Sequence, residues 1–165
     1  MSPDERTADA WLPISEDACL WFVDLALEQM VAIVRGLGDV DANRRPDLAG
    51  ANSPYVILTH CLGVLEFWGG RMIAERTITR DRNAEFEARG TVDALIERTD
   101  ASRRQYERDV ANIESLARPP NVLPPKELAL PYARTKGAVL LHVMRELFQH
   151  LGQMELSRDV LRASH

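Results

Sequence analysis

The stretch from residue 52 to residue 76, NSPYVILTHCLGVLEFWGGRMIAER, decides the fold because its apolar residues almost encircle a helix. Ser53 is suited to cap this helix, and Pro54 takes the first helical position, where its missing N–H costs nothing. Glu66 and Arg71 interrupt the apolar surface. A helix with this pattern has to be buried among neighbours, so the sequence predicts a core helix over about 54–76.

Three further segments repeat apolar residues at helical spacing. One runs over about 15–36, with Ser15 as its cap and two glycines at its end. Another runs from Thr91 toward the helix-stopping Pro119, and the last runs from near Thr135 to about residue 162. No segment shows a convincing two-residue alternation typical of strands. The predicted fold is therefore all-α, a four-helix bundle with long interhelical loops.

The length of the chain suits one domain with a single core. We expect residues 1–165 to form one four-helix domain with short flexible ends at about 1–12 and 162–165. Each of the three expected connections is longer than about 12 residues, and loops of that length often line a functional site. They also permit crossovers, so the order of the helices in space stays open.

Composition and charge exclude some classes of function. A formal net charge of -5 argues against the basic face that nucleic acid requires. The longest apolar runs fall short of the ~20 residues of a membrane span, and the acidic start, MSPDERTADAW, is unlike an export signal. We therefore expect a cytoplasmic protein with no membrane or nucleic-acid partner. Cys19 and Cys61 lie in apolar helical patterns, which favours buried, reduced thiols.

A row of ionisable residues on the last helix points to a metal site. His142, Glu146 and His150 are four residues apart, so they share one helix face at intervals of about 6 Å. The two histidines are separated by about 12 Å of helical rise, so they cannot both bind the ion that Glu146 binds. A further ligand must come from a facing helix, where His60 is the only other internal histidine. One ion would explain a buried histidine and a buried glutamate together, although a lone buried imidazole bonded to a carbonyl is the alternative for His60.

Two segments resemble a known family. THCLGVLEFW, residues 59–68, and ELFQHLGQMELSRD, residues 146–159, are similar to the metal-binding segments of the DinB-like superfamily. Its members are four-helix bundles with one histidine on the second helix and two ligands four residues apart near the end. The set His60, Glu146 and His150 resembles that of the DinB-like domain of mycothiol-dependent maleylpyruvate isomerase. The resemblance extends over essentially the whole chain and leaves His142 out of the ligand set.

The resemblance also implies an activity, because several DinB-like proteins are thiol S-transferases that use mycothiol, bacillithiol or glutathione. Three protein ligands leave a position open on a zinc-like ion, and a thiol entering there would lose its proton. We therefore expect one divalent metal ion, zinc or otherwise nickel or another divalent ion, and mycothiol as the thiol cosubstrate. The expected function is a metal-dependent thiol S-transferase that conjugates mycothiol to electrophiles. The alternatives are a metal-dependent hydrolase of the same fold and a non-catalytic metal- or ligand-binding bundle.

Two residues are candidates for a supporting role around the metal. Asp24 interrupts the apolar stripe of the first helix and could orient His60, with a solvated position as the alternative. Gln153 lies three residues after His150 on the same face, so it could bind a metal-bound water or the substrate, or make a structural hydrogen bond.

Two arginines and one surface remain as further candidates. Arg80 and Arg82, in TITRDRN, could attract an acidic thiol cofactor, although solvated loop charges are the simpler interpretation. An exposed apolar helix face would permit a homodimer, as in other small bundles.

Overall fold

The computed structural model describes residues 15–111, 113 and 134–163. Its elements in chain order are α1 (Glu16–Ala42), α2 (Pro54–Val64), η3 (Leu65–Ile73), α3 (Arg82–Phe86), α4 (Val92–Ala111) and α6 (Lys136–Ala163). No strand occurs in these residues. The predicted all-α fold is confirmed.

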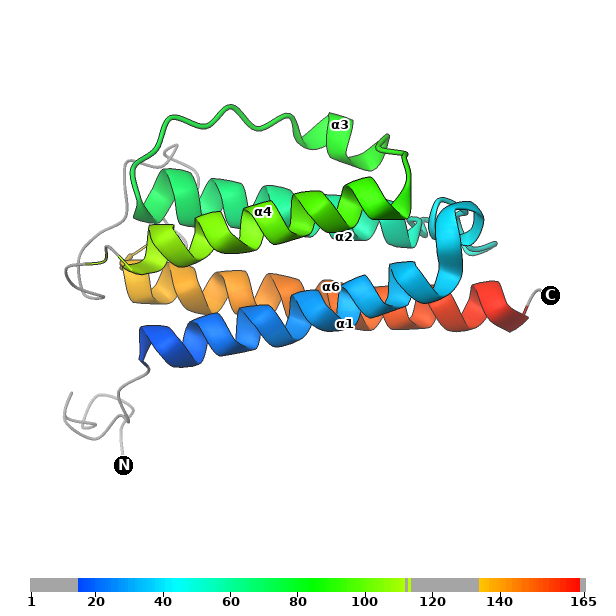
Figure 1. Ribbon diagram of the computed structural model, residues 1–165, viewed down its shortest axis with the longest axis horizontal. Coiled ribbons are helices and arrows are strands. Elements are labelled where there is room, and N and C mark those ends of the chain that lie inside the picture. The colour runs from blue at the N-terminus through cyan, green and yellow to red at the C-terminus, as the bar shows by residue number, and fades with distance from the viewer. Residues whose placement is uncertain (1–14, 112, 114–133, 164–165) are drawn as a thin grey trace.

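The four long helices are arranged up, down, down, up. Figure 1 shows α1 and α6 side by side and pointing the same way, while α2 and α4 run in the opposite direction. The chain leaves η3 at one end of the bundle and returns along its length, through α3, to begin α4 at the other end. This crossover settles the connectivity that the sequence left open. It also lays α3 against α2.

The core helix is formed by α2 and η3 together. All eleven residues of α2 are buried, as the encircling apolar pattern predicts. By length and hydropathy alone, Pro54–Ile73 could cross a membrane, which the longest uninterrupted apolar runs in the sequence did not reveal. However, 83% of the apolar stretch within this segment is buried inside the protein. That degree of burial is consistent with a core helix.

Two helix ends differ from the sequence prediction. α1 continues past the expected end to Ala42, because Gly38 takes a left-handed φ of 70° and kinks the helix instead of stopping it. After the kink, Asp39 Oδ1 accepts a hydrogen bond of 2.7 Å from the backbone N–H of Val92. The extension thus places a carboxylate at the N-terminus of α4, where the helix dipole favours it. The core helix ends at Ile73 and not near residue 76.

The other two long helices begin within one residue of the predicted start. α6 differs by one residue at each end from the expected 135–162, and α4 begins at Val92, one residue after the expected start. Ile113 lies outside a helix, so α4 is shorter than the apolar pattern suggested. The proline-rich loop before α6, the rest of that pattern and residues 1–14 and 164–165 lie outside the described residues.

Both cysteines are buried and free, as expected. Burial is the main cause that raises the pKa of the Cys19 thiol and of the Cys61 thiol. Both therefore stay protonated at neutral pH. They act as small apolar packing groups and not as nucleophiles.

A glycine in η3 allows α4 to approach the core helix. A Cβ atom built on Gly69 would overlap the ring of Tyr106, which is only 2% exposed. We expect Gly69→Ala to lower the free energy of unfolding by about 1–3 kcal/mol, as overpacking typically does. Gly152→Ala is the matched control, because a Cβ there meets nothing within 4 Å. Urea unfolding that gave the same loss for both variants would contradict this packing.

Candidate metal centre

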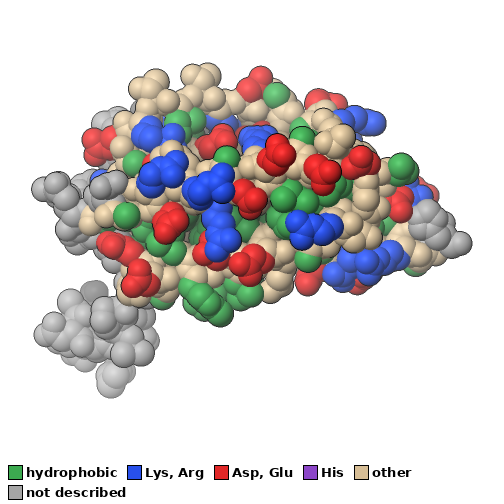
Figure 2. All heavy atoms as spheres, in the orientation of Figure 1, with side chains coloured by type: hydrophobic (Ala, Val, Ile, Leu, Met, Phe, Trp, Pro, Cys, Tyr) green, Lys and Arg blue, Asp and Glu red, His purple; other side chains and the backbone are tan. Residues whose placement is uncertain are grey.

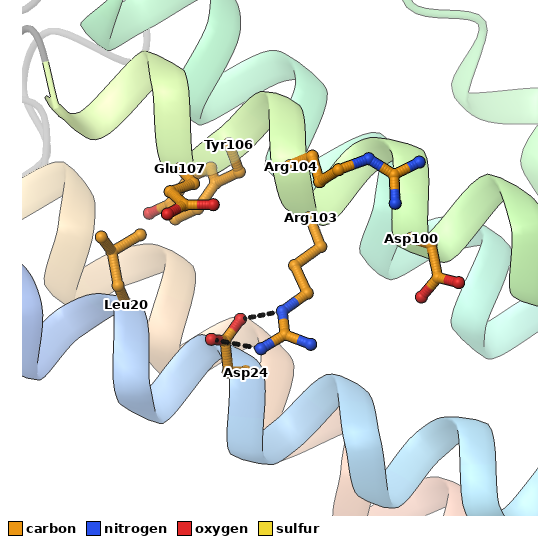
Figure 3. Close-up of a pocket in the computed structure, with 7 residues that line it drawn as sticks. All are labelled: Leu20, Asp24, Asp100, Arg103, Arg104, Tyr106 and Glu107. Carbon is orange, nitrogen blue, oxygen red and sulfur yellow. Dashed lines mark hydrogen bonds and ion pairs between the residues drawn. The ribbon is translucent and has the colours of Figure 1, made fainter.

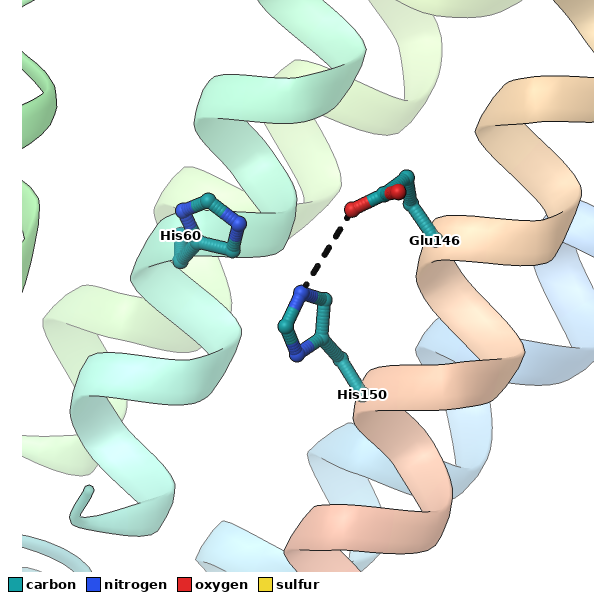
Figure 4. A group of neighbouring side chains, drawn as sticks. All are labelled: His60, Glu146 and His150. Atoms are coloured by element: carbon teal, nitrogen blue, oxygen red, sulfur yellow. Dashed lines mark ion pairs between the residues drawn. The ribbon is translucent and has the colours of Figure 1, made fainter. Parts of the chain in front are cut away.

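The facing surfaces of α2 and α6 bring three metal-ligating side chains to one point (Figure 4). His60 projects from α2, and Glu146 and His150 project from consecutive turns of α6. One ligand atom from each lies within 4.8 Å of the others. His150 Nε2 is 3.6 Å from Glu146 Oε2, and the two imidazole rings are 4.8 Å apart at 81°. The residues that the sequence proposed as one ligand set are therefore neighbours in the fold.

Hydrogen bonds set the tautomer of both histidines. Nδ1 of His60 donates to Oε2 of Glu85 at 2.8 Å, and Nδ1 of His150 donates to Oε1 of Gln153 at 2.8 Å. Both partners are oxygen acceptors, so Nδ1 is the donor in each bond, and Nε2 is the ring nitrogen left to bind a metal ion. Arg80 Nη2 lies 3.4 Å from the Nδ1 atom of His60, but the shorter contact to the carboxylate decides the tautomer.

This donor set fits a divalent metal ion. Two imidazole nitrogens and one carboxylate are ligands that zinc-like ions take, and metal-bound histidines normally donate their other N–H to an acceptor. Burial is the main cause that lowers the pKa of His150, although the bond to Gln153 and the charge of Glu146 act in the other direction. His150 is therefore neutral at neutral pH, as a metal ligand must be.

Glu85, which the sequence analysis missed, is the carboxylate that holds His60. Burial alone would raise the pKa of Glu85, but hydrogen bonds from His60 and Arg80 outweigh burial and lower it. Arg80 binds both carboxylate oxygens, at 2.6 Å and 2.9 Å. Glu85 is thus an ionised group only 7% exposed, fixed between a histidine and an arginine.

Local sequence features bring Glu85 to this position. Asp81 caps α3 by accepting from the backbone N–H of Ala84, which fixes the single turn that carries Glu85. Gly63 on α2 supplies the space, because a Cβ there would overlap the Glu85 carboxylate. The signals that could have revealed Glu85 are therefore this cap and a glycine one turn after His60.

The expected role of Asp24 is not supported. Both of its carboxylate oxygens accept hydrogen bonds from Arg103 of α4, at 2.5 Å and 2.6 Å. Asp24 lines a separate cavity of about 260 Å³ between α1 and α4 (Figure 3). Asp24 cannot orient His60 because the two side chains face different helices: Asp24 faces α4, whereas His60 faces α3 and α6.

The other two candidates lie close to the site. Gln153 makes the hydrogen bond to His150 that was one of its two predicted roles. His142 does not belong to the group of three, but it is buried and its Nδ1 is 4.0 Å from Glu146 Oε1. Its ring also meets Trp68 edge to face at 4.6 Å. His142 is therefore a neighbour of the site, not a distant bystander.

A cavity of about 380 Å³ gives access to the ligand atoms. Its walls combine metal-ligand, aromatic and cationic side chains: His60, Val64, Phe67, Trp68, Arg80, Arg82, His142 and Glu146. A small molecule in this space would reach two of the three ligand residues. This arrangement is typical of a catalytic metal site with an accessible coordination position, not of a closed structural site.

Comparison with known protein families gives a match that covers most of the chain. A family model described as mycothiol-S-transferase matches residues 19–163. That range contains the three candidate ligand residues and the hydrogen-bonding partners of the two histidines, Glu85 and Gln153. A comparison with curated proteins gives no match.

Proposed function

The chain belongs to the mycothiol S-transferase family, a family of enzymes, and from this premise we propose that it joins mycothiol to small electrophiles with the aid of one divalent metal ion. His60, Glu146 and His150 would hold the ion, which we propose is zinc. The observation that carries the proposal is the hydrogen bond at Nδ1 of each histidine. Because an oxygen acceptor holds each Nδ1, the other ring nitrogen, Nε2, is left to bind the ion. The adjoining cavity offers room for a substrate.

The proposed reaction forms one C–S bond. The sulfur of mycothiol attacks an electrophilic carbon, the leaving group departs with its bonding electron pair, and the thiol proton goes to solvent. When bound, a divalent ion supplies the Lewis acidity that lowers the pKa of a thiol and makes it a nucleophile at neutral pH.

The protein's own residues contribute orientation and charge. Glu85 and Gln153 orient the two imidazole rings through hydrogen bonds to their Nδ1 atoms. Glu146 adds a negative charge to the ligand set, so the site with a divalent ion would carry about +1. Phe67 and Trp68 form an apolar wall that excludes water beside the reacting atoms.

Two finer features complete the proposal. We place the protein in the cytoplasm, and we propose a homodimer through the exposed apolar face where α1 meets α6. Trp21 is 59% exposed, and Phe22 stacks edge to face against Trp21 and against Phe148 of α6. Hydrophobic side chains project over α1 at the lower edge of Figure 2. Sedimentation velocity tests the dimer, with Trp21→Glu expected to give monomers.

A thiol panel tests the function. Zinc-loaded protein is mixed with monochlorobimane and with mycothiol, bacillithiol or glutathione at equal concentrations. We expect at least about tenfold faster conjugation with mycothiol, because the family that the chain belongs to uses this thiol. Chelation of the metal should remove the activity, and zinc should restore it.

Two results would contradict this function. Hydrolysis of test esters without any thiol conjugation would favour a metal-dependent hydrolase. Stoichiometric metal binding without turnover of either kind would favour a non-catalytic bundle.

A further inference from the structure

In the part of the chain that the structure describes, the cavity beside the proposed metal centre has one cation with no carboxylate partner, Arg82. Arg82 is exposed at the start of α3, and its guanidinium lies over the ring of Phe86 at 5.8 Å. Among the described residues, it makes no ion pair with a carboxylate. Arg80, on the same cavity, differs because both oxygens of Glu85 bind its guanidinium. The charge of Arg82 is therefore available to a ligand.

Arg82 lies close enough to the metal centre to act there. It lines the same cavity as His60 and Glu146. The opposite charges of Arg80 and Glu85 cancel each other. With a divalent ion on two neutral histidines and one carboxylate, the remaining charges in the cavity are net positive. The chain as a whole carries -5, so this cavity is a local positive site on an acidic protein.

The rest of the cavity is suited to an apolar group. Val64, Phe67 and Trp68 line it, and Trp68 is only 7% exposed. Phe67 is flanked by two guanidinium groups, of Arg71 at 5.7 Å and Arg80 at 5.9 Å, which holds its ring in place. An apolar wall with a cation at the side is complementary to a ligand that has an apolar body and an anionic end.

We propose that the electrophiles accepted by this protein carry a carboxylate, which Arg82 binds while the apolar body packs on Phe67 and Trp68. This inference rests on the proposed thiol transfer, whose chemistry it leaves unchanged. The C–S bond forms at the electrophilic carbon, the leaving group departs with its electron pair, and the carboxylate takes no part in the bond changes. Arg82 is thus a residue that determines specificity.

A matched pair of electrophiles tests the proposal. para-(Chloromethyl)benzoate and its methyl ester differ in charge but share the reacting carbon and the chloride leaving group. We expect zinc-loaded protein with mycothiol to prefer the acid by about tenfold in kcat/KM, mainly through KM, as a charged hydrogen bond would give. R82Q should lower this acid-to-ester ratio about tenfold. R104Q removes an equal charge from an exposed position of α4 and should leave the ratio unchanged.

Binding of unreactive analogues gives a second measurement that does not depend on turnover. para-Methylbenzoate is expected to bind about tenfold more tightly than para-methylbenzamide by calorimetry, and R82Q should abolish the difference. Equal affinity for acid and amide would overturn the inference, and so would a preference for the acid that survives R82Q, because the carboxylate would then be bound elsewhere. A rise in KM for mycothiol in R82Q, with an unchanged acid-to-ester ratio, would also overturn it. If neither electrophile is conjugated, thiol transfer itself fails, and the inference fails with it.

Discussion

Zinc content is expected to fall from about one ion per chain to background in His60→Ala and in His150→Ala, with a loss of thiol transfer of more than about a hundredfold. Each variant leaves a donor set of two side chains, which is too few for a tight site. Loss of an outer hydrogen-bonding partner typically costs 10–100-fold in metal affinity, so loss of a direct ligand should cost more. Elemental analysis of protein purified without a histidine tag measures the metal. Circular dichroism checks that the variants remain folded.

His142→Ala is the matched control for this experiment. The substitution removes a buried imidazole from the same helix. In the wild type, Nδ1 of this imidazole lies 4.0 Å from Glu146 Oε1. It is nevertheless outside the group of three whose ligand atoms converge. We expect the His142→Ala variant to keep its zinc. Loss of zinc in His142→Ala with retention in His150→Ala would show that Glu146 pairs with the other histidine.

The sequence could predict that His60, Glu146 and His150 lie together because their grouping depends mainly on local geometry. A four-residue stride places Glu146 and His150 on one face of any helix, whatever the rest of the fold. The choice of His150 over His142 came from family resemblance, and the structure brings His150 within reach of His60. The helix that carries His60 was predictable because its apolar pattern is long and almost continuous.

The surroundings of the ligands were not predictable in the same way. α3 is a helix of five residues, too short to show a periodic apolar pattern. Its position also depends on the crossover from η3 to α4, which helical periodicity does not specify. A carboxylate near His60 was expected, but the sequence cannot say which helix face meets the histidine. For this reason Asp24 was considered and Glu85 was missed.

The change from α2 to η3 was also hidden in the sequence. A π-helical segment shifts the angular position of each following side chain, but in a helix that is apolar nearly all round the pattern does not reveal the shift. The change has consequences for the site, because Phe67 and Trp68, which line the cavity, both lie in η3.

Replacement of Glu85 is expected to have the second large effect, because this residue serves the metal ligand and the fold at once. Glu85→Leu removes the acceptor for Nδ1 of His60, so zinc affinity should fall about 10–100-fold. It also leaves the Arg80 guanidinium without its carboxylate. Loss of one partner of a buried pair typically costs 3–5 kcal/mol, and we expect about 3 kcal/mol because Arg80 remains 16% exposed.

A double variant separates the two roles. Arg80→Met combined with Glu85→Leu removes both charges and replaces them with apolar groups of similar volume. Such replacements are often neutral for stability, so the free energy of unfolding of the metal-free protein should return to within about 1 kcal/mol of the wild type. Zinc affinity should stay low, because His60 would still lack a carboxylate on Nδ1.

Gly63→Ala provides an independent route to the same effect on the metal. The added methyl group would displace the Glu85 carboxylate but leave both charges in the protein. Zinc affinity should therefore fall in Gly63→Ala as well, measured by competition with a chelator of known affinity. If the double variant recovered stability and wild-type zinc affinity together, Glu85 would act only as the ion-pair partner of Arg80. The fixed tautomer of His60 would then have no part in holding the metal, and the proposed site would rest on the convergence of its three ligands alone.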